Sequence, residues 1–171
     1  MTVTSPKRPA SIVIARLPRQ LVGSTTFLLK RLGFAAKERS MSAYEQVGLH
    51  PYHHAVLIAL GEGSHETQGS IADALGYDRG QLVGLLDELE KRGLVERRRD
   101  PQDRRRHLVS LTADGKRMLG GLNTVARKNE DAFLDPLTDA ERETLHALLL
   151  KLAEKHEPGC APLPPPAAYS G

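Results

Sequence analysis

The chain has 171 residues, a length that suits one domain with an added dimerisation layer better than two independent domains. Hydrophobic residues make up 40% of it and aromatic residues only 4%, which favours a core of aliphatic side chains between packed helices. The single cysteine, Cys160, excludes an internal disulfide framework and a zinc cluster built on cysteines. No stretch approaches the roughly 18 apolar residues of a membrane span, so we expect a cytoplasmic protein with no membrane partner.

The first 48 residues divide into an arm and a helical segment. Two prolines in residues 1–17 block an early helix, so this stretch is expected to form a flexible N-terminal arm. Apolar residues then recur near helical spacing from Pro18, which suits a first helical turn, to Val47. This pattern predicts one long helix, although Gly23 and Gly33 weaken it.

Shorter elements follow this segment. Pro51 opens a predicted helix that runs through Leu60, and the glycine-rich stretch 61–64 predicts a turn. Thr67 is expected to cap a short helix over residues 68–75, because a threonine oxygen accepts hydrogen bonds from the free N–H groups of a first turn. A glycine follows the last residue of this helix and predicts its end.

The next helix is predicted from Asp78 to about Gly93. Its start resembles a capping box, with Asp78 at the cap and Gln81 three residues on. One face carries an apolar stripe made of Leu82, Leu85, Leu86 and Leu89. Two predicted strands, 94–99 and 106–111, then flank the turn-forming residues Asp100, Pro101, Gln102 and Asp103, which together predict a β-hairpin.

Two further helices are predicted in the C-terminal part. Thr112 caps a long helix that runs to about Leu134, where an Asp-Pro pair breaks it. Residues 138–141 form a full capping box, Thr-Asp-Ala-Glu, and start a helix with regularly spaced leucines. Residues 158–171 are rich in proline, glycine and alanine and are expected to form a disordered tail.

Basic residues gather around the predicted hairpin. Between residues 91 and 106 only three acidic residues oppose eight cations. The cations are Lys91, Arg92, Arg97, Arg98, Arg99, Arg104, Arg105 and Arg106. An isolated run of this kind is often a solvated loop, but this one follows a short helix, a tight turn and a second helix. That order over residues 67–111 is the order of a winged helix-turn-helix, in which a helix enters the major groove and the hairpin approaches phosphates. The sequence therefore predicts DNA binding.

Four stretches within this region carry a family resemblance: Ile71–Gly76, Leu86–Arg97, Asp100–Arg105 and Leu108–Thr112. They resemble the MarR family of bacterial regulators, and the helix order extends the resemblance over about residues 18–157. It implies a mainly α fold with a small β-hairpin wing and a helical dimerisation layer. Residues 18–48 and 112–157 would form the dimerisation region, and residues 49–111 the winged helix-turn-helix domain. It also implies a homodimer on a pseudo-palindromic operator.

Double-stranded DNA is thus the expected partner, and three groups of residues are expected to contact it. Phosphate would bind at the start of the short helix through Thr67, Gln68 and Ser70. The major groove would receive Arg79, Gly80, Gln81 and Gly84. The wing and the end of the helix before it would contribute Lys91, Arg97, Arg98, Arg99, Arg104 and Arg106. The resemblance further implies that Arg105 enters the minor groove and that Asp103 braces it.

The recognition helix departs from the family pattern at two positions. Family members commonly have Ser or Thr at the position of Gly80, and Arg or another long polar residue at that of Gly84. Both glycines remove side chains that would contact bases. We therefore expect Gln81 to be the main base reader, because glutamine pairs bidentately with adenine.

Three histidines lie near the start of the second helix, and the resemblance implies a ligand pocket in that part of the fold. Such pockets lie between the dimerisation helices and the winged domain, which makes Tyr44, His53 and His54 candidate ligand-binding residues for a small phenolic or anionic effector. A purely structural interpretation of the histidines is helix capping and interface packing near the dimerisation layer. A metal site is less favoured, because no cysteine motif or second carboxylate accompanies His50 and His54.

No enzyme is expected, because the chain has no P-loop, no G-x-S-x-G motif and no glycine-rich dinucleotide motif, and no cofactor is expected either. The sequence predicts a transcriptional regulator, in the first place a ligand-responsive repressor. Two alternatives stay open: an architectural or constitutive DNA-binding protein with no small-molecule input, and a metal-responsive regulator. Cys160 is expected to be a bystander thiol in the tail.

Overall fold

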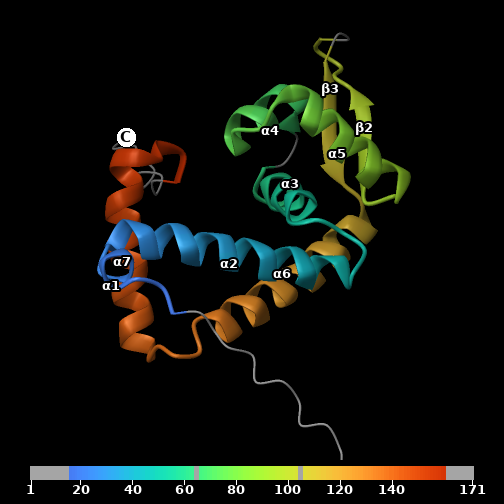
Figure 1. Cartoon of the computed structure of the whole chain (residues 1–171). Helices are drawn as coiled ribbons and strands as arrows, with labels where there is room; N and C mark the ends of the chain where they lie inside the picture. The colour runs from blue at the N-terminus through green and yellow to red at the C-terminus, as the bar shows by residue number, and fades with distance from the viewer. Residues whose placement is uncertain (1–15, 64–65, 104–105, 161–171) are drawn as a thin grey trace, which may run out of the picture. The chain divides into compact units, whose positions relative to one another are not determined.

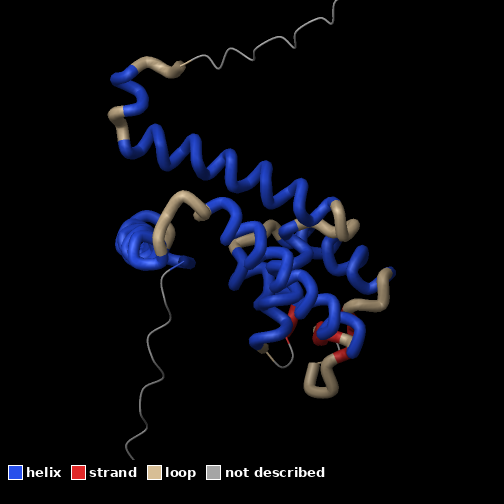
Figure 2. The backbone as a smooth tube through the Cα atoms, turned by 90° about the horizontal axis from the view of Figure 1, so that it is seen from below, coloured by secondary structure: helices blue, strands red, loops and turns tan. Residues whose placement is uncertain are grey.

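The computed structural model describes residues 16–63, 66–103 and 106–160, so most of the predicted arm and of the predicted tail lies outside it. In chain order (Figure 1) the elements are α1 (Arg19–Val22), α2 (Thr25–Glu45), α3 (Pro51–Glu62), β1 (Glu66–Thr67), α4 (Gln68–Leu75), α5 (Arg79–Lys91), β2 (Val95–Arg99), β3 (His107–Leu111), α6 (Ala113–Phe133), α7 (Asp139–His156) and the 3₁₀ turn η1 (Pro158–Cys160). Helices dominate and the strands are short (Figure 2). This confirms the predicted mainly α fold with a small β-hairpin.

The chain divides into two compact units, residues 1–36 and 37–171. Within the first unit, the predicted long helix from Pro18 is interrupted. Gly23 ends α1 by bonding back to the Arg19 carbonyl, and the Ser24 hydroxyl accepts a hydrogen bond from the Phe27 N–H at 3.3 Å at the start of α2. The prediction of one continuous helix was therefore wrong at this point, because a serine offers the backbone an N-terminal cap.

The second unit contains the helix-turn-helix and the sheet. The sheet has the order β1-β3-β2, and β3 pairs antiparallel with both neighbours, with Val95 opposite Leu111 and Arg99 opposite His107. The hairpin was predicted, but β1 was not, since a strand of two residues has no periodicity to detect. The predicted turn over 61–64 is also partly wrong, because α3 extends through Gly61 to Glu62.

One buried core joins the helices and the sheet of the second unit. It is formed by aliphatic side chains of α3, α4, α5, both hairpin strands and α6, with Val56, Leu57, Leu86, Leu89 and Val109 fully buried. Leu85 is only partly buried, so three of the four predicted stripe leucines of α5 reach the centre of the core. This core fixes α5 against the hairpin, which is the arrangement on which any function of the two together depends.

The start of α6 lies unusually close to the segment between α5 and β2. The Thr112 hydroxyl donates to the Gly93 carbonyl at 2.7 Å and accepts the Gly115 N–H at 2.9 Å. A side-chain carbon at Gly115 would overlap the Leu94 carbonyl, so only glycine fits at this close approach. The predicted cap of α6 is thereby confirmed, and the same contact anchors α6 to the end of the helix-turn-helix.

Candidate nucleic-acid interface

Two capped helices and a glycine turn form the helix-turn-helix. The Thr67 hydroxyl accepts the Ser70 N–H at 3.1 Å at the start of α4. Gly76 ends α4 at a φ of +64°, a left-handed conformation that glycine adopts without strain. Asp78 Oδ1 then accepts the N–H groups of Gly80 and Gln81, at 2.8 and 3.2 Å, and starts α5. The predicted caps therefore set the turn between the two helices.

The face of α5 opposite the core is open. Arg79, Gly80, Gln81, Val83 and Gly84 are all exposed on the first turns of this helix. A side-chain carbon at Gly84 would meet nothing within 4 Å, so its surroundings are empty space and not a packed neighbour. The major groove of B-DNA admits an exposed helix face of this kind.

The hairpin places its basic residues beside this face. Arg98 and Arg99 lie exposed near the end of β2, and Arg106 lies exposed before β3. Arg98 contacts Glu96 at 3.1 Å, and Arg106 contacts Asp103 at 3.5 Å. Two backbone hydrogen bonds close the tip of the hairpin. The Asp100 N–H donates to the Arg106 carbonyl, and the Arg106 N–H donates to the Asp103 carbonyl.

The predicted brace of Arg105 by Asp103 is not tested by these contacts, because Arg104 and Arg105 lie outside the described residues. Among the other predicted contact residues, Lys91 lies exposed at the end of α5, and Gln68 lies partly buried at the start of α4. The structure thus brings the α5 face and the flanks of the hairpin together in one unit.

Arg97 stands apart from the other wing arginines. Its side chain is only 17% exposed, and its guanidinium contacts Asp87 Oδ1 at 2.6 Å and Glu90 Oε2 at 2.8 Å. It also donates to the Val83 carbonyl at 3.5 Å. The sequence prediction treated Arg97 as a DNA contact, but the guanidinium is engaged by α5. The signal that was missed is the pair of carboxylates three residues apart on the helix flank.

The side chains of the candidate ligand residues form hydrogen bonds within the protein. The buried His54 ring contacts the Tyr44 hydroxyl through Nδ1 and Asn123 Oδ1 through Nε2, the latter at 2.8 Å. His54 thereby links Tyr44 at the end of α2 to Asn123 on α6. His53 Nδ1 accepts the His50 N–H at 3.1 Å and completes a reciprocal cap of α3. These contacts agree with capping and packing as the role of the histidines.

His53 links the cap of α3 to the recognition helix. It is buried, and its Nε2 lies 3.0 Å from Glu88 Oε2 on α5. Burial lowers the pKa of His53 below its usual value, and Glu88 only partly opposes this effect. The unfolded chain therefore binds more protons at this residue than the folded chain does, so His53 destabilises the fold as the pH falls below about 6.5.

We expect the wild-type thermal midpoint to fall between pH 7.5 and pH 5.5, and part of that fall to disappear in His53→Asn. Asparagine keeps an acceptor for the His50 N–H but does not titrate. His146→Asn, at an exposed position on α7, is the matched control and should retain the full pH dependence. Equal pH dependence in all three proteins would show that the buried ring is not responsible.

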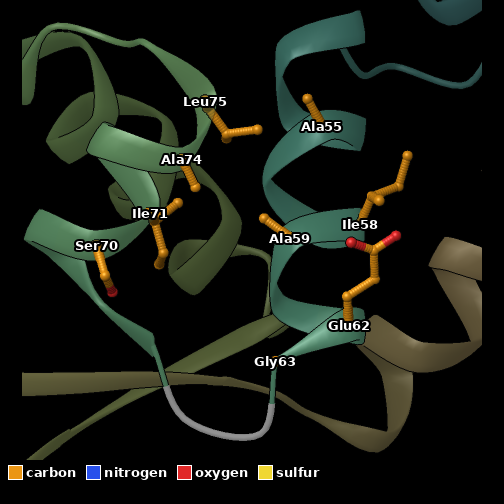
Figure 3. A pocket seen from close by; sticks show the side chains of 9 residues that line it. All are labelled: Ala55, Ile58, Ala59, Glu62, Gly63, Ser70, Ile71, Ala74 and Leu75. Carbon is orange, nitrogen blue, oxygen red and sulfur yellow. The ribbon is translucent and has the colours of Figure 1, made fainter. Parts of the chain in front are cut away.

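A cavity of about 560 Å³ lies between α3 and α4, beside the helix-turn-helix (Figure 3). Ala59 of α3 points toward Ile71 of α4, and Ala55, Ile58, Ala74 and Leu75 also line the cavity. Glu62 and Ser70 supply its polar side chains. Tyr44, His53 and His54 are not among the lining residues, so the predicted ligand residues and this cavity do not coincide.

No group of three or more His, Cys, Asp or Glu side chains that could hold a metal ion is present among residues 16–63, 66–103 and 106–160. Cys160 is exposed in η1. Over the same described ranges, no helix has the length and apolar character needed to cross a membrane. None of these findings adds a second candidate site to the interface formed by α5 and the hairpin.

Known proteins share this arrangement. The sequence profile of the MarR family matches residues 47–106. Transcriptional regulator HosA of Escherichia coli is 31% identical over 58% of this chain and 73% of its own length. The transcriptional repressor CouR, solved on a 23-mer DNA duplex, superposes with a TM-score of 0.73 and 32% identity over 81% of this chain and 99% of its own. The PcaV transcriptional regulator from Streptomyces coelicolor, solved with its natural ligand, superposes with a TM-score of 0.66 and 27% identity. The match covers 84% of this chain and 100% of the PcaV chain.

Proposed function

This chain belongs to the MarR family of transcriptional regulators, and we propose that it binds a pseudo-palindromic operator as a homodimer and represses the adjacent genes. The observation that carries the proposal is the exposed face of α5 beside a hairpin with exposed arginines. CouR, a repressor with the same fold, was solved on DNA, which supports this use of the surface. Members of this family are regulators and not enzymes.

The dimerisation region is proposed to comprise residues 18–48 and 112–157, and the DNA-binding domain residues 49–111. Large apolar side chains that a second copy of the chain would cover are exposed on α2 and on α7, among them Leu28, Leu29, Leu32 and Phe34, and Leu148, Leu149 and Leu152. Surface apolar groups of this number favour association, because burial removes them from water.

The proposed DNA contacts fall into the same three groups as the sequence predicted, with one change. Thr67, Gln68 and Ser70 approach phosphate from α4, and Arg79, Gly80, Gln81 and Gly84 enter the major groove. The wing side contributes Lys91, Arg98, Arg99, Asp103, Arg104, Arg105 and Arg106. Arg97 is reassigned from DNA contact to a brace between β2 and α5, because Asp87 and Glu90 already engage its guanidinium.

Gln81 remains the proposed reader of adenine, since it is exposed next to two glycines that offer no side chain. Gln81→Ala is expected to lose about 1–3 kcal/mol of discrimination at one base pair of each half-site, while binding to unrelated DNA stays the same. Competition binding with duplexes altered one base pair at a time measures this. Unchanged base preference in the variant would contradict the assignment.

The effector is proposed to bind in the cavity between α3 and α4. Its volume suits a small organic molecule, and its lining is mostly apolar with one carboxylate and one hydroxyl. The Glu62 carboxylate would repel an anion, so a neutral phenolic molecule fits this lining better than the anionic class does. Occupancy would alter the contact of α4 with α3 and shift the population away from the DNA-binding arrangement.

Titrating neutral phenols and aromatic acids into the protein–DNA complex tests the effector proposal. Saturable release by neutral phenols, weakened by Ala59→Phe, supports it, because the added ring fills the cavity. Binding that no compound releases would favour the constitutive or architectural alternative. No observation in the described residues favours the metal-responsive alternative.

A further inference from the structure

We propose that Val83 reads thymine by contact with the C5-methyl group of the base, an inference that rests on the proposed DNA-binding function of α5. Val83 is a large apolar side chain that stays 40% exposed on the recognition helix. Thymine is the base that presents an apolar group in the major groove, and apolar side chains recognise it there.

Two glycines lie close to Val83 along the helix. Gly80 precedes it by three residues and Gly84 follows it, and both lie exposed without side chains. A side-chain carbon at Gly84 would meet nothing within 4 Å. A base edge can therefore approach the helix backbone closely at Gly84, next to the valine, whereas a side-chain carbon at Gly80 would lie 3.0 Å from Asp78 Oδ1.

The carboxylates next to Val83 are engaged within the protein. Asp87 lies one turn further along the same side of α5, where an unpaired carboxylate would repel phosphates. Arg97 pairs with that carboxylate at 2.6 Å and also donates to the Val83 carbonyl at 3.5 Å. One arginine thus weakens the repulsion from Asp87 and Glu90 beside Val83, and its hydrogen bond to the Val83 carbonyl links this part of α5 to the hairpin.

An apolar reader two residues along α5 from Gln81 fits the chemistry of one base pair type. Glutamine reads adenine through hydrogen bonds and valine reads the thymine methyl through burial, so the two residues favour A·T pairs in the half-site. The glycines then have a positive role, because they let the short valine side chain reach a methyl group that longer neighbours would keep away.

Replacing thymine by deoxyuridine removes only the methyl group and leaves all hydrogen bonds intact. The experiment uses the duplex that the wild-type protein selects from a random pool, with each thymine replaced in turn. Wild type should bind about three- to fourfold more weakly at one thymine of each half-site, the loss expected for one buried methyl group. The Val83→Ala variant should bind the parent duplex and the duplex with deoxyuridine at that position equally well. The Gln81→Ala variant should keep the preference for thymine over deoxyuridine at that position.

Two results would overturn the proposal. One is a wild-type protein that binds every deoxyuridine duplex as tightly as the parent. The other is a Val83→Ala variant that retains the wild-type ratio at the sensitive thymine. In either case sequence-specific binding to the selected duplex stands, so the proposed function survives. If no duplex is enriched by selection, the proposed function itself fails. Val83 is exposed and alanine favours helix, so a matching circular dichroism spectrum is expected for the variant.

Discussion

Arg97→Ala is expected to weaken DNA binding about ten- to a hundredfold and to lower the stability of the fold as well. The substitution removes hydrogen bonds to two carboxylates, and bonds of this charged kind contribute about 1.5–3 kcal/mol. It frees Asp87 and Glu90 beside the surface that receives phosphates. It also removes the side-chain link between β2 and α5, so the spacing of the wing and the recognition helix depends on the buried core alone. The protein loses the brace and a cation that faces both carboxylates.

Arg99→Ala is the matched control, because Arg99 is an exposed arginine on the same strand. It should leave the thermal midpoint unchanged and reduce the slope of log affinity against log salt concentration by about 0.9, the value for one phosphate contact. Fluorescence anisotropy over a salt series and thermal unfolding measure both properties. An Arg97→Ala protein with wild-type stability and the same change in salt slope as Arg99→Ala would show that Arg97 is a phosphate contact after all.

Gly115→Ala is expected to destabilise the fold by about 1–3 kcal/mol, the usual penalty for overpacking. The new methyl group would overlap the Leu94 carbonyl, which is backbone and cannot rotate away. Relief requires α6 to move from the segment that joins α5 to β2, so the Thr112 hydrogen bonds to that segment should weaken as well.

Gly120→Ala, on the same helix, is the control for Gly115→Ala. A side-chain carbon at Gly120 meets nothing within 4 Å, and alanine there should stabilise the helix by up to about 1 kcal/mol. Urea unfolding at one protein concentration gives both free energies, since the stability of the proposed dimer would depend on concentration. Equal effects of the two substitutions would mean that the close approach at Gly115 has no energetic weight.

Local chemistry made much of this fold predictable from the sequence. Thr67, Asp78, Thr112 and Thr138 all cap helices as expected, because each side-chain oxygen binds N–H groups within three residues. The hairpin followed from two strand-like stretches around a turn of Asp and Pro. These elements depend on neighbours in sequence, which is why the sequence sufficed.

Features that depend on contacts between distant residues were not predictable in the same way. The pairing of Arg97 with Asp87 requires the packing of β2 on α5, and a run of arginines does not reveal which one turns inward. The contact of His54 with Asn123 joins α3 to α6 across 69 positions. The interpretation of the histidines as caps was sound, whereas their use as ligand residues has gained no support.

Selection of DNA from a random pool by the purified protein tests the central claim most directly. The account predicts enriched sites with two inverted half-sites whose centres lie about one helical turn, ~10 bp, apart, since a two-fold dimer places its recognition helices in successive major grooves. Enrichment of a single asymmetric site, or no enrichment at all, would contradict it.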